Sequence, residues 1–237
     1  MTARTGFIHR LCAFAAMTLL SAALFAACAE ADAPQHQRII DMSVELLQKM
    51  ALEGDAPAFA DAIKSSRGVA IFPSLVQAGL GIGGMHGEGI VLFRNAKGGW
   101  TGPSYVSLVG GSFGLQIGIK QVGLVLTINN DDGKRVFTGG KSFKLGGDAS
   151  IAAGPLGRDA EAATDSRAQA SLYSYSMSRG AFAGLTISGS TVNVNGDANQ
   201  AYWGSDIEPK AALSKPANNK KVAKLVAELN KLIKSVK

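Results

Sequence analysis

The chain has 237 residues, 46% of them hydrophobic, and a formal net charge of +6, which suits one folded domain of ordinary size. The positive charge is concentrated at the end of the chain: residues 208–237 contain eight lysines and two glutamates, so residues 1–207 are neutral overall. A nucleic-acid-binding domain needs a basic face on its folded core, and this distribution argues against that class.

Residues 1–27 are predicted to be an export signal. Arg4 and Arg10 occur without any acid in the first ten residues, and a weakly polar to apolar run follows over Leu11–Ala27. This order is typical of a secretory signal peptide. An uncleaved membrane anchor is the alternative, although the run is short for a membrane span.

Cys28 is the predicted lipidation site. It follows Leu24-Phe25-Ala26-Ala27, which resembles the lipobox of bacterial lipoproteins, although Phe25 stands where Leu, Val or Ile is usual. With Ala29 after the cysteine, such a lipoprotein is expected at the outer membrane. A plain signal-peptidase cut nearby is the alternative and would give a periplasmic or secreted protein. The only other cysteine is Cys12, inside the signal, so disulfides and cysteine-ligated metals are excluded from the mature chain.

After a linker at residues 28–37, two helices are expected. The first begins near Pro34 and stops at Gly54, because apolar residues recur at helical spacing on one face and proline favours a first turn. This helix either packs on a sheet or contacts a membrane as an amphipathic helix. A second, short helix is predicted around residues 55–63.

The stretch from Gly79 to Gly123 predicts the character of the fold. Fourteen of its 45 residues are glycine, and most of the others are β-branched, aromatic or aliphatic. Glycine costs a helix about 1 kcal/mol relative to alanine, whereas in sheets it marks bulges, tight bends and close backbone approaches. We therefore expect an α+β fold with a strongly curved antiparallel sheet that can close towards a barrel.

The predicted strands continue beyond this stretch to residue 194. Asp131-Asp132-Gly133-Lys134 has the composition of a hairpin turn. A terminal helix at residues 197–203 is expected to place Tyr202 and Trp203 over the core. The predicted strands are 69–72, 89–93, 105–109, 112–119, 124–129, one from 143 to 158 with a bulge and a bend, 171–177, 181–188 and 191–194.

Residues 207–237 are predicted to be a linker followed by a basic amphipathic helix. Asn218-Asn219 offers a cap for KKVAKLVAELNKLIKSVK, whose apolar residues recur at i, i+3, i+4 and i+7. Such a helix can lie in a bilayer interface, where lysines are attracted by anionic head groups. Alternatively, its apolar stripe docks on its own domain or on a partner helix. The candidate membrane-contact residues are Lys220, Lys221, Lys224, Leu225, Leu229, Lys231, Leu232 and Lys234.

The search for catalytic and cofactor motifs argues against an enzyme. Gly79–Gly84 matches G-x-G-x-x-G, but strand-like residues follow, and Ser104 stands where a dinucleotide site needs an acid. Gly139-Gly140-Lys141-Ser142 lacks the upstream glycine of a P-loop. His86 and Glu88 are too few ligands for a zinc site. We therefore expect no catalytic residues, no cofactor and no metal.

Four long motifs, in order along the chain, resemble the successive signatures of the SYLF (Ysc84-type) domain family. The resemblance extends from about residue 36 to 204 and is far more specific than any single glycine pattern. The motifs are RGVAIFP at residues 67–73, GGSFGLQIG at 110–118, LGGDASIAAGPLGR at 145–158 and SYSMSRGAFAG at 174–184.

The resemblance implies that residues 38–206 form a SYLF-like lipid-binding domain. Eukaryotic members of the family bind phosphoinositide-containing membranes, and some fungal members bind and bundle actin. We therefore expect a non-enzymatic module that recognises anionic phospholipid or phosphoinositide head groups, with a protein partner as the alternative and no role for nucleic acid. The sequence does not predict the oligomeric state. The candidate head-group ligands are Lys120, Lys134, Arg135, Lys141 and Lys144.

Overall fold

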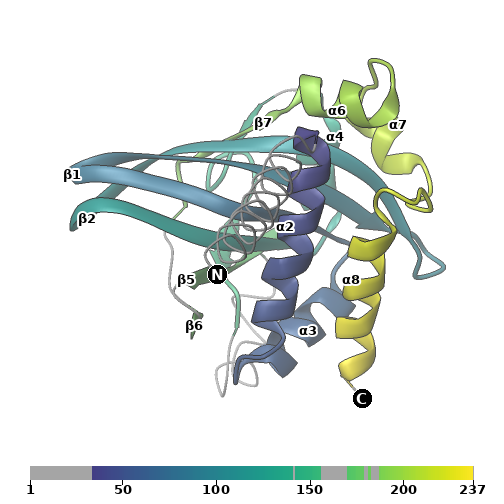
Figure 1. Ribbon diagram of the computed structural model, residues 1–237, viewed down its shortest axis with the longest axis horizontal. Coiled ribbons are helices and arrows are strands. Elements are labelled where there is room, and N and C mark those ends of the chain that lie inside the picture. Colours follow the sequence, from purple (N-terminus) through teal and green to yellow (C-terminus); the bar gives the residue numbers. More distant parts are fainter. Residues whose placement is uncertain (1–33, 141, 156–169, 179–180, 183–186, 237) are drawn as a thin grey trace, which may run out of the picture. The chain divides into compact units, whose positions relative to one another are not determined.

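The computed structural model describes residues 34–140, 142–155, 170–178, 181–182 and 187–236. Residues 36–237 group into one compact unit. No helix within the described ranges has the length and apolarity needed to cross a membrane. Along the chain (Figure 1), the elements are α2 (Gln35–Met50), α3 (Ala56–Ser65), β1 (Gly68–Arg94), β2 (Trp100–Ile128), α4 (Asp131–Thr138), β3 (Phe143–Lys144), β4 (Ile151–Ala153), β5 (Leu172–Ser178), β6 (Ala181–Phe182), β7 (Thr191–Val194), α6 (Gly196–Trp203), α7 (Pro209–Ser214) and α8 (Ala223–Ser235).

Strands β1 and β2 form one long antiparallel ribbon, visible as the curved bands in Figure 1. Gly68 pairs with Ile128 at one end, and Arg94 pairs with Trp100 beside the connecting turn. The register shifts along the way, as it does between Leu80 and Ile82. The sequence predicts five separate strands here. The structure joins them into two, because bulges and glycines bend a strand without ending it.

The two halves of β1 lie against each other, and glycine makes this close approach possible. A Cβ atom at Gly87 would lie 2.5 Å from the carbonyl oxygen of Ser74. Near the strand ends, the backbone N–H of Arg94 donates to the carbonyl oxygen of Arg67 at 2.8 Å. The ribbon therefore folds back on itself, and the prediction of a strongly curved, glycine-rich sheet in an α+β fold is confirmed.

The remaining strands extend the sheet from β2 on both sides of the ribbon. The path of hydrogen-bonded neighbours is β3-β7-β2-β5-β4, with β1 also beside β2 and β6 beside β5. The pair β4–β5 is parallel, which differs from the purely antiparallel sheet expected from the sequence. The single strand predicted at 143–158 is divided into β3 and β4, and its last residues lie outside the described part of the chain.

Side-chain alternation along β1 builds a core on each face of the sheet. Val69 and Ile71 belong to a helix-side core, which also contains residues of α2, α3, α6 and α8. Ala70 and Phe72 belong to an opposite core, which α4, α7 and β3 help to cover. The first predicted helix therefore packs on the sheet: Ile39, Leu46, Leu47 and Met50 are buried, whereas Met42 remains 39% exposed.

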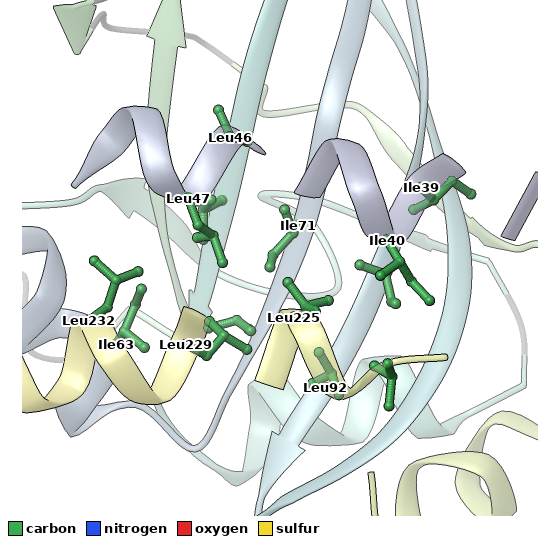
Figure 2. Close-up of a cluster of buried hydrophobic side chains, with 14 of the residues drawn as sticks. Ile39, Ile40, Leu46, Leu47, Ile63, Ile71, Leu92, Leu225, Leu229 and Leu232 are labelled. Atoms are coloured by element: carbon green, nitrogen blue, oxygen red, sulfur yellow. The ribbon is translucent and has the colours of Figure 1, made fainter. Parts of the chain in front are cut away.

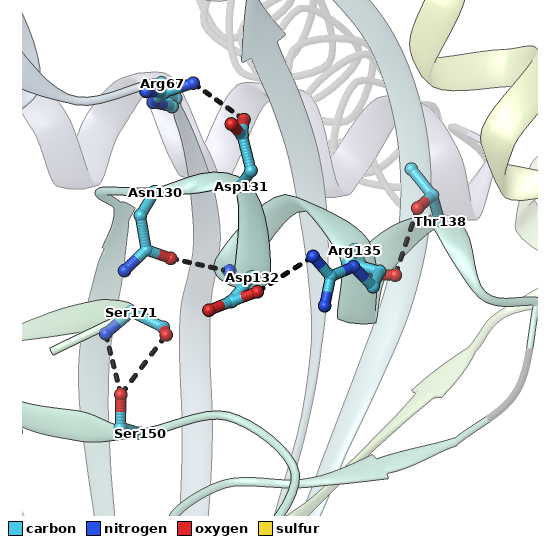
Figure 3. A network of polar contacts seen from close by, with 9 residues as sticks. Arg67, Asn130, Asp131, Asp132, Arg135, Thr138, Ser150 and Ser171 are labelled. Atoms are coloured by element: carbon cyan, nitrogen blue, oxygen red, sulfur yellow. Dashed lines mark hydrogen bonds and ion pairs between the residues drawn. The ribbon is translucent and has the colours of Figure 1, made fainter.

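The predicted hairpin turn at residues 131–134 is wrong, since this segment begins helix α4. The side chain of Asn130 caps the helix by accepting from the backbone N–H of Gly133 at 2.9 Å (Figure 3). Asp131 and Asp132 lie in the first turn, where the helix dipole favours negative charge. The predicted helix around Asp197–Trp203 is confirmed as α6, with Tyr202 buried in the helix-side core.

Candidate functional site: the outer face of helix α8

The sequence predicts a cap at Asn218-Asn219 with the helix directly after it, but α8 begins at Ala223, and its N-cap residue, Val222, makes no side-chain capping hydrogen bond. The side chain of Asn219 accepts a hydrogen bond from the backbone N–H of Lys221 at 3.0 Å. Val222 then enters the helix-side core as a fully buried residue. The chain is thus fixed at the start of α8, which determines which side of the helix faces the domain.

The inner face of α8 is apolar and buried. Leu225, Leu229 and Leu232 are 0%, 0% and 3% exposed. Figure 2 shows them on the side of α8 that faces the cluster, together with Ile63 of α3 and Leu47 of α2. In the structure these leucines pack on the chain's own domain, as the docking alternative expects.

Two polar contacts also fasten this inner face. The indole Nε1–H of Trp100 donates to Oδ1 of Asn230 at 3.0 Å. The side chain of Gln48 in α2 donates to a carboxylate oxygen of Glu228 at 3.3 Å. The sequence separates residues 207–237 from the domain at 38–206, but in the structure α8 shares the core of that domain.

Exposed lysines on α8 and just before it form what we call the lysine ridge. They are Lys220, which lies in the turn before the helix, and Lys224, Lys231 and Lys234 on the helix itself. Lys224 and Lys231 are two turns apart, or about 10 Å along the axis. The helix has one acid, Glu228, whose side chain is only 9% exposed and lies 3.2 Å from Nζ of Lys231. Because the acid is turned inwards and the lysines outwards, the exposed surface of α8 is strongly basic.

Lys221 differs from the ridge lysines, although it is also exposed. Its Nζ donates to the backbone carbonyl oxygen of Tyr202 at 3.3 Å and lies 5.3 Å from the centre of that tyrosine ring. It therefore ties the start of α8 to α6. Of the predicted membrane-contact residues, the ridge lysines face outwards, Lys221 has a contact of its own, and the leucines are inside.

The other predicted head-group ligands come from three separate elements. Lys134 and Arg135 share α4: Nζ of Lys134 lies 4.9 Å from the ring centre of Phe93, and Arg135 pairs with Asp132 at 2.9 Å (Figure 3). Lys144 is exposed on β3, and Lys120 lies opposite Gln77 in the ribbon. Lys141 lies outside the described residues, as does the predicted lipidation site, Cys28.

Polar residues that could have formed a metal site are arranged for other roles. His86 is exposed on β1, and Glu88 accepts a hydrogen bond from Asn195 at 3.2 Å. Within the described ranges, no three histidine, cysteine, aspartate or glutamate side chains form a group that could hold a metal ion.

Sequence reasoning missed a cluster of rings beside the start of α8. His36, Tyr105 and Tyr202 come from α2, β2 and α6 and pack edge to face or tilted, with centroids 5.7 to 6.3 Å apart. The expected position of Tyr202 over the core was the one available signal. Nothing in the sequence indicates that residues this far apart meet.

A folded-back glycine-rich ribbon with helices packed over both of its faces makes this an α+β domain. The sequence model of the Ysc84 family, described as "Las17-binding protein actin regulator", matches residues 109–232. The chain belongs to this Ysc84 (SYLF) family. The matched range includes most of α8, which the four sequence motifs leave out.

Proteins of yeast, frog and human are similar in sequence to this chain. The chain is 35% identical over 156 residues to LAS seventeen-binding protein 3 of Saccharomyces cerevisiae, covering 65% of this chain and 34% of the relative. It is similar to the SH3 domain-containing YSC84-like protein 1 of Xenopus laevis (36% over 144 residues; 61% and 43%) and of Homo sapiens (32% over 178 residues; 75% and 51%). The chain thus spans about a third to a half of these relatives. The yeast relative is named for Las17 binding, and none of the three names refers to an enzymatic activity.

Proposed function

We propose that this protein is a non-enzymatic module that binds anionic lipid head groups at a membrane surface through the lysine ridge of α8. The observation that carries the proposal is the division of charge on this helix, with Glu228 turned inwards and the lysines outwards. Docking of the leucines keeps the helix in place without a bilayer, so the ridge is a preformed surface. Lysines near an anionic membrane contribute about 1 kcal/mol each.

The proposal distinguishes the ridge from the other predicted ligands. Arg135 pairs with Asp132, as Lys231 of the ridge pairs with Glu228, and Lys134 lies over Phe93. These residues are less available for a head group than Lys224 and Lys234. Lys120, Lys141 and Lys144 stay as secondary candidates for head-group contact. Recognition of phosphoinositides, as opposed to anionic phospholipid in general, also belongs to the proposal and requires vesicles that differ only in that lipid.

Vesicle co-sedimentation of the full chain tests the ridge. Lys224→Glu with Lys234→Glu is the informative variant, because Lys231 pairs with Glu228 and its loss would disturb docking. Loss of two favourable lysines alone should weaken binding to anionic vesicles by about thirtyfold, and the two added glutamates should weaken it further. High salt should weaken wild-type binding. Neutral vesicles should bind poorly in every case.

The matched control reverses the charge of two lysines outside α8. Lys97→Glu with Lys210→Glu alters two exposed lysines outside α8 by the same total charge. If both double variants lose binding equally, net charge is responsible and the ridge is not a site. If neither loses binding, the ridge proposal is wrong, and Lys144→Glu with Lys120→Glu becomes the next variant.

A protein partner is the second candidate, favoured by the names of the relatives. The family description refers to Las17 binding and actin regulation, and one relative is named for Las17 binding. For this chain, co-sedimentation with filamentous actin separates the two proposals. Binding to actin without binding to anionic vesicles would support the protein partner and reject the lipid function.

We also propose that the protein is exported and anchored through acylated Cys28, which would hold the domain close to a membrane surface. The support is the signal-like sequence before Cys28 and the lipobox resemblance. The intact mass of the protein from its native host tests this directly. A mass without acyl chains would reject the anchor but leave the ridge proposal standing.

A further inference from the structure

Three buried rings and one exposed lysine join the start of α2 to the rest of the domain. We call His36, Tyr105, Tyr202 and Lys221 the His36 cluster. The His36 ring lies 5.8 Å from that of Tyr202 and 6.3 Å from that of Tyr105, both edge to face. These residues come from α2, α6, β2 and the segment before α8, so one cluster connects four parts of the fold.

Hydrogen bonds hold the cluster together from the outside. The hydroxyl of Tyr105 donates to the backbone carbonyl oxygen of His36 at 3.3 Å. The side chain of Asn199 makes two hydrogen bonds to the backbone of Tyr105: it accepts from the N–H at 2.9 Å and donates to the carbonyl oxygen at 3.0 Å. Lys221 donates to the carbonyl oxygen of Tyr202. The surroundings of His36 are therefore well fixed.

The surroundings of His36 favour the neutral form of its imidazole. It is 5% exposed, and its Nδ1 is buried without a hydrogen-bond partner among the described residues. The titratable groups that face it are the two tyrosines, from β2 and α6, and the ammonium of Lys221. A protonated imidazole donates from both nitrogens and would need an acceptor or an anion here. The charged group that faces His36 in the cluster is a cation, the ammonium of Lys221.

We propose that His36 is an acid-sensitive latch, which holds the N-terminal end of α2 on the domain at neutral pH and releases it on protonation. The released end adjoins the segment that carries Cys28, so the latch would control how closely the domain is held to its predicted anchor. This proposal does not depend on lipid binding by the lysine ridge. The latch could exist in a domain that binds a protein partner.

The direction of the pH effect follows from the environment of the imidazole. Burial, and then the charge of Lys221, lower the pKa of His36 below its ordinary value of 6.5. The unlatched state takes up a proton more readily than the latched state. The latch is therefore fully stable above pH 6.5 and weakens as the pH falls from there towards the lowered pKa. For each pH unit by which the pKa of His36 is lowered, the equilibrium constant for opening the latch at acid pH becomes about tenfold larger.

Hydrogen–deuterium exchange of the full chain at pH 7.5 and pH 5, corrected for intrinsic exchange rates, tests the latch. We expect amides just after the first turn of α2, from Ile39 to Ser43, to lose protection at the lower pH, while α3 keeps its protection. His36→Phe retains a ring in the cluster and removes the titration, so its α2 should respond little to pH. The matched control is His86→Ala, which removes the exposed histidine of β1 and should leave the response unchanged.

A second variant and a direct titration complete the test. Lys221→Met removes the neighbouring charge, which should raise the pKa of His36 and reduce the acid response of α2. An NMR titration of the wild-type imidazole decides the question even if His36→Phe does not fold. A pKa of 6.5 or above for His36, or an acid response that persists in His36→Phe, would overturn the proposal.

Discussion

Trp100 and Asn230 are 130 positions apart in the chain, yet the indole Nε1–H of Trp100 donates to Oδ1 of Asn230 at 3.0 Å. Trp100 begins β2 and is 5% exposed, so its N–H depends on this one amide oxygen for a partner. The contact fixes where α8 lies along the sheet. Together with the burial of Leu225, Leu229 and Leu232, it leaves the lysines of the helix on the outside.

Asn230→Ala should loosen α8 without removing an apolar contact. The change leaves the indole N–H unsatisfied, which we expect to cost about 1–3 kcal/mol of unfolding free energy. Chemical denaturation measures this cost, and hydrogen exchange should show it first in α8. Asn218→Ala, at an exposed position just before the helix, is the matched control and should change stability by less than about 0.5 kcal/mol.

Leu229→Ala tests whether α8 belongs to the folded core. Leu229 is fully buried in the helix-side core, so truncation should cost about 2–5 kcal/mol. Lys224→Ala, on the outer face of the same helix, should cost less than about 0.5 kcal/mol. If the two variants unfold at the same denaturant concentration, α8 is not docked in solution, and its leucines would be free to meet a membrane.

The sequence could predict that α8 is amphipathic but not what its apolar face touches. A bilayer and a protein core bury the same residues at the same spacing, so Leu225, Leu229 and Leu232 satisfy both hypotheses. The deciding contacts are Trp100–Asn230 and Gln48–Glu228, and neither leaves a signal in a local stretch of sequence.

Gly133 explains the failed prediction at residues 131–134. The local sequence predicts that this glycine belongs to a hairpin turn, but a Cβ atom there would lie 2.6 Å from the carbonyl oxygen of Ser171. It is needed because α4 packs closely on the chain just before β5, a reason that depends on tertiary structure. The curvature of the sheet was predictable for the opposite reason, since glycines repeated through β1 and β2 indicate bends wherever the partner strand lies.

Gly87→Ala should destabilise the folded-back ribbon. The added Cβ would lie 2.5 Å from the carbonyl oxygen of Ser74 and 3.1 Å from Cα of Leu75, and backbone atoms cannot move aside as a flexible side chain can. We expect a loss of about 1–3 kcal/mol, as for other overpacked sites, measured by thermal or chemical unfolding.

Gly84→Ala is the matched control for this prediction. It lies in the same strand, but its added Cβ would have no heavy atom within 4 Å. Alanine also restricts the unfolded chain, so stability should be unchanged or higher by up to about 1 kcal/mol. Equal losses in both variants would mean that a general cost of alanine in β1, and not the contact with Ser74, is responsible.

Tyr202→Phe should be tolerated at neutral pH and should protect the domain at alkaline pH. The hydroxyl oxygen of Tyr202 is buried without a hydrogen-bond partner among the described residues, so its removal costs no hydrogen bond. Burial raises the pKa of Tyr202 from 10.0 to about 12. The unfolded chain therefore releases this proton first, and stability falls as the pH rises from 10 towards 12.

Burial also raises the pKa of Tyr105 and Tyr175, so the Tyr202→Phe variant should reduce this alkaline loss of stability without abolishing it. Unfolding free energies from pH 8 to 11 measure the effect, and a variant that is less stable than wild type at pH 8 would show that the hydroxyl has a partner in solution.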